Sequence, residues 1–289
     1  MMRKRRPAWS SAFAPDTLRT FQRVGPIDDV DREWAWGDST GKGVKVAIID
    51  SGVDAEHPAL GGRVDGYVDI TEGPDGLIYD TGPHDDVFGH GTACAGIIRD
   101  LAPECEIHSV RVLGPTLSGQ GSVFAAGLRW ALENGMQVCN LSLSTSKKDF
   151  FGVLHALSDR AYFGNVMLVA SANNMPGASY PATYASVFSV ASHDVGDPYH
   201  FYYNPRPPVE FGAHGIDVRV AWLNGRWQTT TGNSFATPHI AGLVAKILGK
   251  HPDLTIFQMK AVLRALSANI SRPDLRRETG GPVGTGGEE

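Results

Sequence analysis

The sequence has no hydrophobic run long enough to cross a membrane, although 42% of its 289 residues are hydrophobic. A transmembrane helix needs about 18 consecutive apolar residues, whereas the most apolar stretches, such as 166–172, have the length of core strands. The basic start MMRKRR is followed by PAWSSAFAPDTLRTFQ, which lacks the apolar segment and cleavage site of a signal peptide. We therefore expect a soluble, cytoplasmic protein.

Cysteine is scarce, and basic charge is not in excess. The three cysteines, Cys94, Cys105 and Cys139, are an odd number with no CxxC spacing, which suits a reducing compartment better than a disulfide framework. We expect them to be buried thiols. The formal net charge of −5 provides no general attraction to nucleic acid or anionic lipid. Neither nucleic acid nor a membrane is therefore an expected partner.

Short apolar, β-branched runs alternate with helical patterns from residue 44 onward. Strands are predicted at 44–49, 107–113, 138–144, 166–171 and 186–192, and helices at 90–99, 122–134, 150–163, 235–249 and 256–267. This alternation predicts an α/β fold in which helices cover both faces of a mostly parallel sheet.

The ends of the chain differ from its middle. We expect an irregular N-terminal extension over 1–26, one domain over 27–270, and a mobile C-terminal tail over 271–289. Within the domain, the Gly/Pro/Asp-rich segment 75–86 is predicted to be a loop.

Three segments place reactive side chains at the ends of predicted elements. Asp50 directly follows the first strand, where open α/β sheets bind ligands, although an Asp there could instead form a turn. His90 lies between two glycines at a helix start, and it could instead be a capping or core histidine. Gly232 and Pro238 place Ser234 at a helix N-terminus, where serine is also a common cap. None of the three segments is decisive alone.

Taken together, the three segments resemble the subtilisin family of serine peptidases. DSG at 50–52, HGT at 90–92 and GNSFATPH at 232–239 occur in the family order Asp, His, Ser. The resemblance covers 27–270 and implies the family's three-layer α/β fold, with Asp50, His90 and Ser234 as a catalytic triad. His90 would take the serine proton and return it to the leaving amine, while Asp50 fixes the imidazole tautomer.

The same resemblance implies an oxyanion donor and a peptide cleft. Matching the family's Gly-Asn pair onto Asn173-Asn174 makes Asn174 the donor, although the register could slip by one residue and Asn pairs are common in turns. A peptide or protein substrate would add as a strand between two edges, with Ser179 on the floor of the pocket for the residue before the cleaved bond. The two edges are Leu117-Ser118-Gly119 and Ser142-Leu143-Ser144.

The sequence also departs from the family pattern. Ala93, Asn233 and Phe235 stand where the family usually has His, Thr and Met, and Asn233 matters most because the usual hydroxyl can support the oxyanion site. Gly121 lies where many relatives have an aromatic lid.

The resemblance also implies a deletion after the second motif, where calcium-dependent relatives have a longer loop that binds a tight calcium ion and this chain runs IIRDLAP at 97–103. We therefore expect no metal at that position and no obligatory cofactor. A weaker calcium site near 85–86 stays open.

The motif HGTACA at 90–95 is similar to that of subtilisin-like enzymes that trim ribosomally made natural-product precursors. This likeness favours one dedicated peptide as the substrate. Two other classes stay open: a catalytically silent subtilisin-fold module that binds peptides, and a nucleotide-binding α/β protein. The second is disfavoured because no GxGxxG or GxxxxGK[ST] follows a predicted strand.

Overall fold

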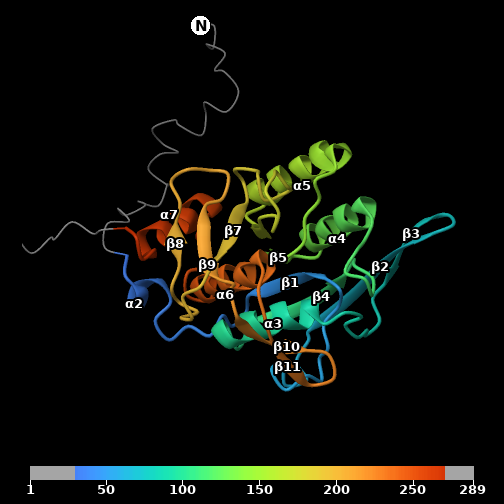
Figure 1. The fold of residues 1–289 in the computed structure, drawn as a ribbon, viewed down its shortest axis with the longest axis horizontal. Helices are drawn as coiled ribbons and strands as arrows, with labels where there is room; N and C mark the ends of the chain where they lie inside the picture. Colours follow the sequence, from blue (N-terminus) through green and yellow to red (C-terminus); the bar gives the residue numbers. More distant parts are fainter. Residues whose placement is uncertain (1–29, 271–289) are drawn as a thin grey trace, which may run out of the picture.

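A twisted sheet runs through the middle of the protein in the computed structural model, which describes residues 30–270 (Figure 1). The predicted extension over 1–26 and tail over 271–289 lie outside the described residues. In sheet order the nine strands are β3 (Gly76–Asp80), β2 (Gly66–Gly73), β4 (Glu106–Arg111), β1 (Lys45–Asp50), β5 (Val138–Leu141), β6 (Met167–Ser171), β7 (Phe188–His193), β9 (Phe211–His214) and β8 (Tyr202–Tyr203).

The sheet is parallel from β2 to β9, and only the two edge strands β3 and β8 pair in the antiparallel sense. A separate antiparallel ribbon is formed by β10 (Val218–Trp222) and β11 (Arg226–Thr230). The carboxyl ends of the parallel strands therefore meet along one edge of the sheet, where this class of fold binds ligands.

Helices cover both faces of the sheet, as the sequence predicted (Figure 1). The helices are α2 (Arg32–Ala35), α3 (His90–Leu101), α4 (Gly121–Glu133), α5 (Phe151–Phe163), which follows the short 3₁₀ helix η2 (Lys148–Phe150), α6 (Asn233–Lys250) and α7 (Ile256–Leu266). Val46 and Ile48 of β1 pack in one core with α3, α6 and α7, whereas Ala47 and Ile49 pack in another with α4 and α5. A strand buried on both faces needs a continuous apolar run, which explains VKVAII at 44–49.

Two predicted boundaries are wrong. The predicted loop 75–86 contains strand β3, which forms a hairpin with β2. Its residues are largely exposed, including Ile78 at 53%, so it lacks the buried alternation that marks a strand. The predicted strand 138–144 ends at Leu141, and the segment beyond it lies at the cleft described below. Every helix within residues 30–270 is too short or too polar to span a lipid bilayer.

Candidate active site

Asp50 and His90 meet at the carboxyl end of β1. Asp50 is the last residue of β1 and is fully buried, and His90 is the first residue of α3. The imidazole Nδ1 donates to both carboxylate oxygens of Asp50, at 2.8 and 2.9 Å. Gly91 permits this approach, because a Cβ there would lie 2.0 Å from the carbonyl oxygen of Gly52.

The Asp50 contact also fixes the protonation behaviour of His90. Because Nδ1 carries the donated proton, Nε2 is left as the acceptor of the neutral ring. Burial acts to lower the pKa of His90, but the negative charge of Asp50, its hydrogen bond and the charge of Asp86 outweigh it and raise the pKa above the ordinary 6.5. The ring is thereby prepared to accept a proton.

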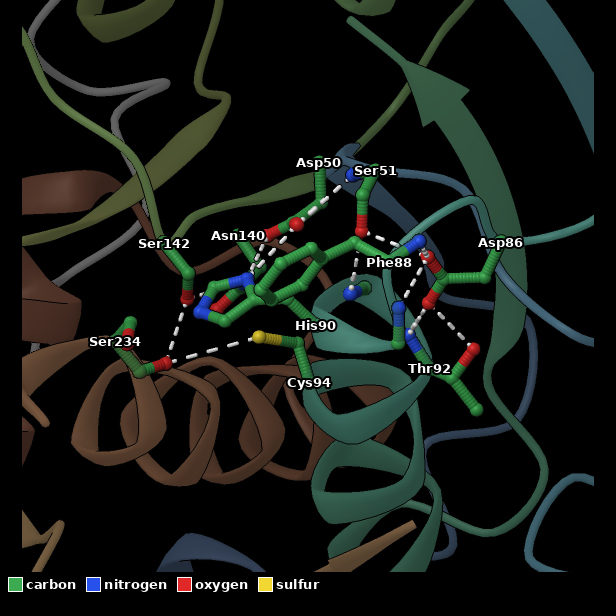
Figure 2. A network of polar contacts seen from close by, with 12 residues as sticks. Asp50, Ser51, Asp86, Phe88, His90, Thr92, Cys94, Asn140, Ser142 and Ser234 are labelled. Atoms are coloured by element: carbon green, nitrogen blue, oxygen red, sulfur yellow. Dashed lines mark hydrogen bonds and ion pairs between the residues drawn. The ribbon is translucent and has the colours of Figure 1, made fainter. Parts of the chain in front are cut away.

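Asp86 organises the turn that leads into α3 (Figure 2). Its buried carboxylate accepts five hydrogen bonds of 2.7–2.9 Å, which come from Ser51 Oγ, Phe88 N, Gly89 N, Thr92 N and Thr92 Oγ1. The first N–H groups of a helix have no partner within the helix, and here the carboxylate supplies one. Sequence reasoning missed this role; the only signal was an Asp a few residues before the His.

The same five hydrogen bonds decide whether Asp86 could be a calcium ligand. A calcium ligand must direct a carboxylate or carbonyl oxygen at the ion, and both oxygens of Asp86 already face protein donors. Asp86 therefore does not fit the weaker calcium site that the sequence left open.

Ser234 is the second residue of α6 and is 9% exposed. Pro238 lies inside this helix, beyond the first turn in which the sequence pattern would tolerate it. Because proline has no N–H, the carbonyl of Ser234 lacks its helical partner. It accepts instead from Ser142 Oγ at 2.8 Å and from Cys94 Sγ at 3.7 Å. The carbonyl that Pro238 leaves without a helical partner thus connects the start of α6 to Ser142, which belongs to a predicted substrate edge.

The structure brings the three predicted triad residues to one place from three elements (Figure 2). The imidazole of His90 lies with its centroid 5.2 Å from the ring of Phe235, the residue after Ser234. Among residues 30–270 no hydrogen bond joins the Ser234 hydroxyl to another group. Such bonds are often long without substrate and tighten in the complex.

The Asn173-Asn174 pair follows β6 in an exposed loop, and its two side chains make different contacts. Asn173 Oδ1 accepts from Met175 N at 3.1 Å, as a turn-forming Asn does. Asn174 Oδ1 accepts from the backbone N–H of Asn233 at 2.9 Å, so its amide faces the start of α6. This contact favours Asn174 over its neighbour as the oxyanion donor.

The two predicted substrate edges line one hollow of about 340 Å³, together with Gly121 and Phe124. The ring of Phe150 from η2 covers Gly121, where an added Cβ would lie 2.3 Å from it. An aromatic side chain therefore reaches this position from another segment.

Ser179 is buried in a second hollow of about 220 Å³, which Asn174 also lines. The backbones of Thr145 and Tyr180 exchange hydrogen bonds of 3.0 and 2.8 Å, and this bridge joins the segment of Ser179 to the edge that ends at Ser144. The structure thus brings all of the predicted site residues to the same edge of the sheet.

The cysteines are buried free thiols, as the sequence predicted. Burial raises the pKa of Cys105 to about 11 and that of Cys139 to about 12. Ligand atoms of Asp50, His90 and Cys94 lie within 4.8 Å of one another, a spacing that a metal ion could use. Burial and the charge of Asp50 raise the pKa of Cys94 well above its usual value, so the thiol keeps its proton; it donates to the carbonyl of Ser234, and His90 Nδ1 donates to Asp50.

Comparisons with known proteins agree with this geometry. Residues 41–280 match the family model described as the subtilase family. Subtilisin E of Bacillus subtilis (strain 168) is 32% identical over 246 residues, which cover 80% of this chain and 62% of that protein. Subtilisin DY of Bacillus licheniformis is 31% identical over 260 residues, covering 85% of this chain and 90% of that protein.

A solved structure of a cold adapted subtilisin-like serine proteinase superposes with a TM-score of 0.64 at 27% identity, covering 83% of this chain and 89% of that one. The chain spans less than two thirds of the length of some curated relatives, namely 62% of Subtilisin E and 65% of the Thermostable alkaline protease of Halalkalibacterium halodurans.

Proposed function

The chain belongs to the subtilase family, and from this premise we propose that it is a serine endopeptidase that cleaves peptide bonds through an acyl-enzyme. The observation that carries the proposal is the pair of hydrogen bonds from His90 Nδ1 to Asp50. They hold the imidazole in the tautomer whose Nε2 can act as a general base.

The proposed reaction begins when Ser234 Oγ attacks the substrate carbonyl carbon and passes its proton to His90 Nε2. The oxygen of the tetrahedral intermediate carries a negative charge, which the Asn174 amide and the Ser234 N–H would stabilise. That N–H lies in the first turn of α6, where it has no acceptor within the helix. His90 then gives its proton to the leaving amine, and water releases the acyl group by the same steps in reverse.

A fluorophosphonate probe tests this function, because it labels only an activated serine. We expect labelling of Ser234 that is lost in Ser234→Ala and kept in Ser158→Ala. Ser158 is a matched control, since its buried hydroxyl donates to the carbonyl of Leu154 within α5. A folded, unlabelled protein that still binds peptides would instead support a catalytically silent module.

We also propose that the substrate is one dedicated peptide rather than bulk protein, because HGTACA at 90–95 is similar to the motif of precursor-trimming relatives. Mass spectrometry of the products from a diverse peptide library is expected to show cleavage at a narrow set of sequences. Rapid, unselective digestion of casein would contradict this.

A further inference from the structure

The side chain of Asn233 joins the ends of two sheet strands to the start of α6. Its Nδ2 donates to the carbonyl oxygens of Ala172 at 3.2 Å and Asn173 at 3.1 Å, just beyond β6. Its Oδ1 accepts from the N–H of Ser192 in β7 at 2.9 Å. A carboxamide has two N–H donors, and both are used here. The side chain therefore has no donor left to offer an oxyanion directly.

The backbone of Asn233 contacts the proposed oxyanion donor itself. Its N–H donates to Asn174 Oδ1 at 2.9 Å, and no other hydrogen bond to the Asn174 side chain occurs in the described part of the chain. Because the oxygen end of that amide is held, the nitrogen end is set by the same contact. Asn174 is exposed on a loop, so without this contact its side chain would sample several rotamers.

We infer that Asn233 is a positioning residue for oxyanion stabilisation: its side chain fixes the backbone of Ala172 and Asn173, and its N–H aims the Asn174 amide at the reacting carbonyl. A threonine hydroxyl has a single donor and cannot make both carbonyl contacts. Asn233 would thus support the oxyanion site by holding the loop and the side chain of Asn174, without touching the oxyanion itself. The inference rests on the proposed peptidase function.

A double-mutant cycle tests whether Asn233 acts through Asn174. The rate of Ser234 labelling by a fluorophosphonate and the hydrolysis of a chromogenic peptide anilide are measured for Asn233→Ala, Asn174→Ala and the double variant. We expect Asn174→Ala to lower kcat by about 10²–10³-fold. Asn233→Ala is expected to lower kcat by roughly 10–100-fold with KM nearly unchanged, as loss of a transition-state interaction does. The double variant should match Asn174→Ala alone to within about threefold.

Asn269→Ala is the matched control, because this amide also donates to a backbone carbonyl and accepts a backbone N–H, both of Tyr203. We expect it to keep its kcat even where its melting temperature falls as far as that of Asn233→Ala. Losses that multiply in the double variant, or an equal loss of kcat in the control, would overturn the inference. If Asn233→Ala fails to fold, Asn233→Leu, which keeps the size of the side chain but none of its hydrogen bonds, is measured in its place with the same expected pattern.

A second readout needs no activity. In ¹⁵N-resolved NMR spectra, the side-chain amide of Asn174 is expected to give two dispersed proton signals. Asn233→Ala keeps the backbone N–H but removes the side-chain contacts that hold the carbonyls of Ala172 and Asn173. The loop should then no longer place Asn174 against that N–H, and the signals should move toward random-coil positions. Unchanged signals would contradict the inference. If the unmodified protein is not labelled by the fluorophosphonate, the proposed function fails, and the NMR result still decides whether Asn233 orients Asn174.

Discussion

The residues proposed for acid–base catalysis and those proposed for oxyanion stabilisation lie in different surroundings. Asp50, His90 and Asp86 are 0%, 4% and 6% exposed, within a dense network of hydrogen bonds. Asn174 is exposed, and Met175 beside it is 71% exposed. Burial strengthens the interaction of charges, which suits the Asp50–His90 pair. The proposed oxyanion donor must instead stay open to substrate, and in our proposal the contacts of Asn233 order it.

The largest expected effect concerns Ser234, where these two sets of residues meet. Ser234→Ala should lower turnover on the order of 10⁶-fold, the loss known for the nucleophile of a subtilisin. Single-turnover and steady-state kinetics on a peptide anilide measure it. A variant that keeps more than about a tenth of the activity would show that another group attacks the substrate.

The next largest effect is expected on removing the exposed side chain of Asn174. Asn174→Ala should lower kcat by about 10²–10³-fold, the known cost of removing this donor in a subtilisin, with little change in KM. Its thermal stability should stay close to that of the unmodified protein, because an exposed side chain with one hydrogen bond is removed. A large rise in KM at constant kcat would instead assign Asn174 to substrate binding.

The buried Asp50–His90 pair leads us to expect that activity depends on pH. Activity should fall as pH drops through the pKa of His90, and this fall should be centred above pH 6.5 because the pKa is raised. Asp86→Asn removes one of the charges that raise it, so the midpoint should move to lower pH. Profiles of kcat/KM against pH for the two proteins measure the shift. A midpoint below 6.5 in the unmodified protein would contradict the electrostatic argument.

Asp86→Asn should also cost stability, by about 1–3 kcal/mol, because an amide leaves some of the buried donors around it without an acceptor. Urea unfolding of the variant measures this cost. Asp85→Asn is the matched control, since among residues 30–270 only the backbone carbonyl of Asp85 accepts a hydrogen bond, from Arg111, and its carboxylate accepts none. Equal stabilities of the two variants would show that the network around Asp86 contributes little.

The smallest effect is expected on removing calcium. The stretch after α3 is short, and the oxygens of Asp86 face protein donors, so a chelator should change the melting temperature by less than about 2 °C. Calorimetry with and without chelator measures it. A drop of more than about 10 °C would reveal a tight ion, because binding to the folded state alone raises stability.

Much of the architecture could be predicted because it depends on local pattern. Apolar strands buried on both faces and amphipathic helices leave a clear period in the sequence, and β1, β4, β6, α3 and α7 were placed within a few residues. The hairpin of β2 and β3 was not, because only Val68 and Ile70 of β2 and no residue of β3 are buried, so neither strand shows a full apolar alternation. Its pairing depends on the neighbouring β4 rather than on its own pattern.

The sequence by itself determined which residue types are available for chemistry and in which order they occur. Asp50, His90 and Ser234 each lie in a short motif that is legible along the chain. The tertiary structure decided how they are held: Asn233 contacts a carbonyl 60 positions away, and Ser142 donates to a carbonyl 92 positions away that Pro238 leaves free. Such contacts depend on how strands and helices pack, because hydrogen bonds between distant segments form only after the fold has brought their partners together.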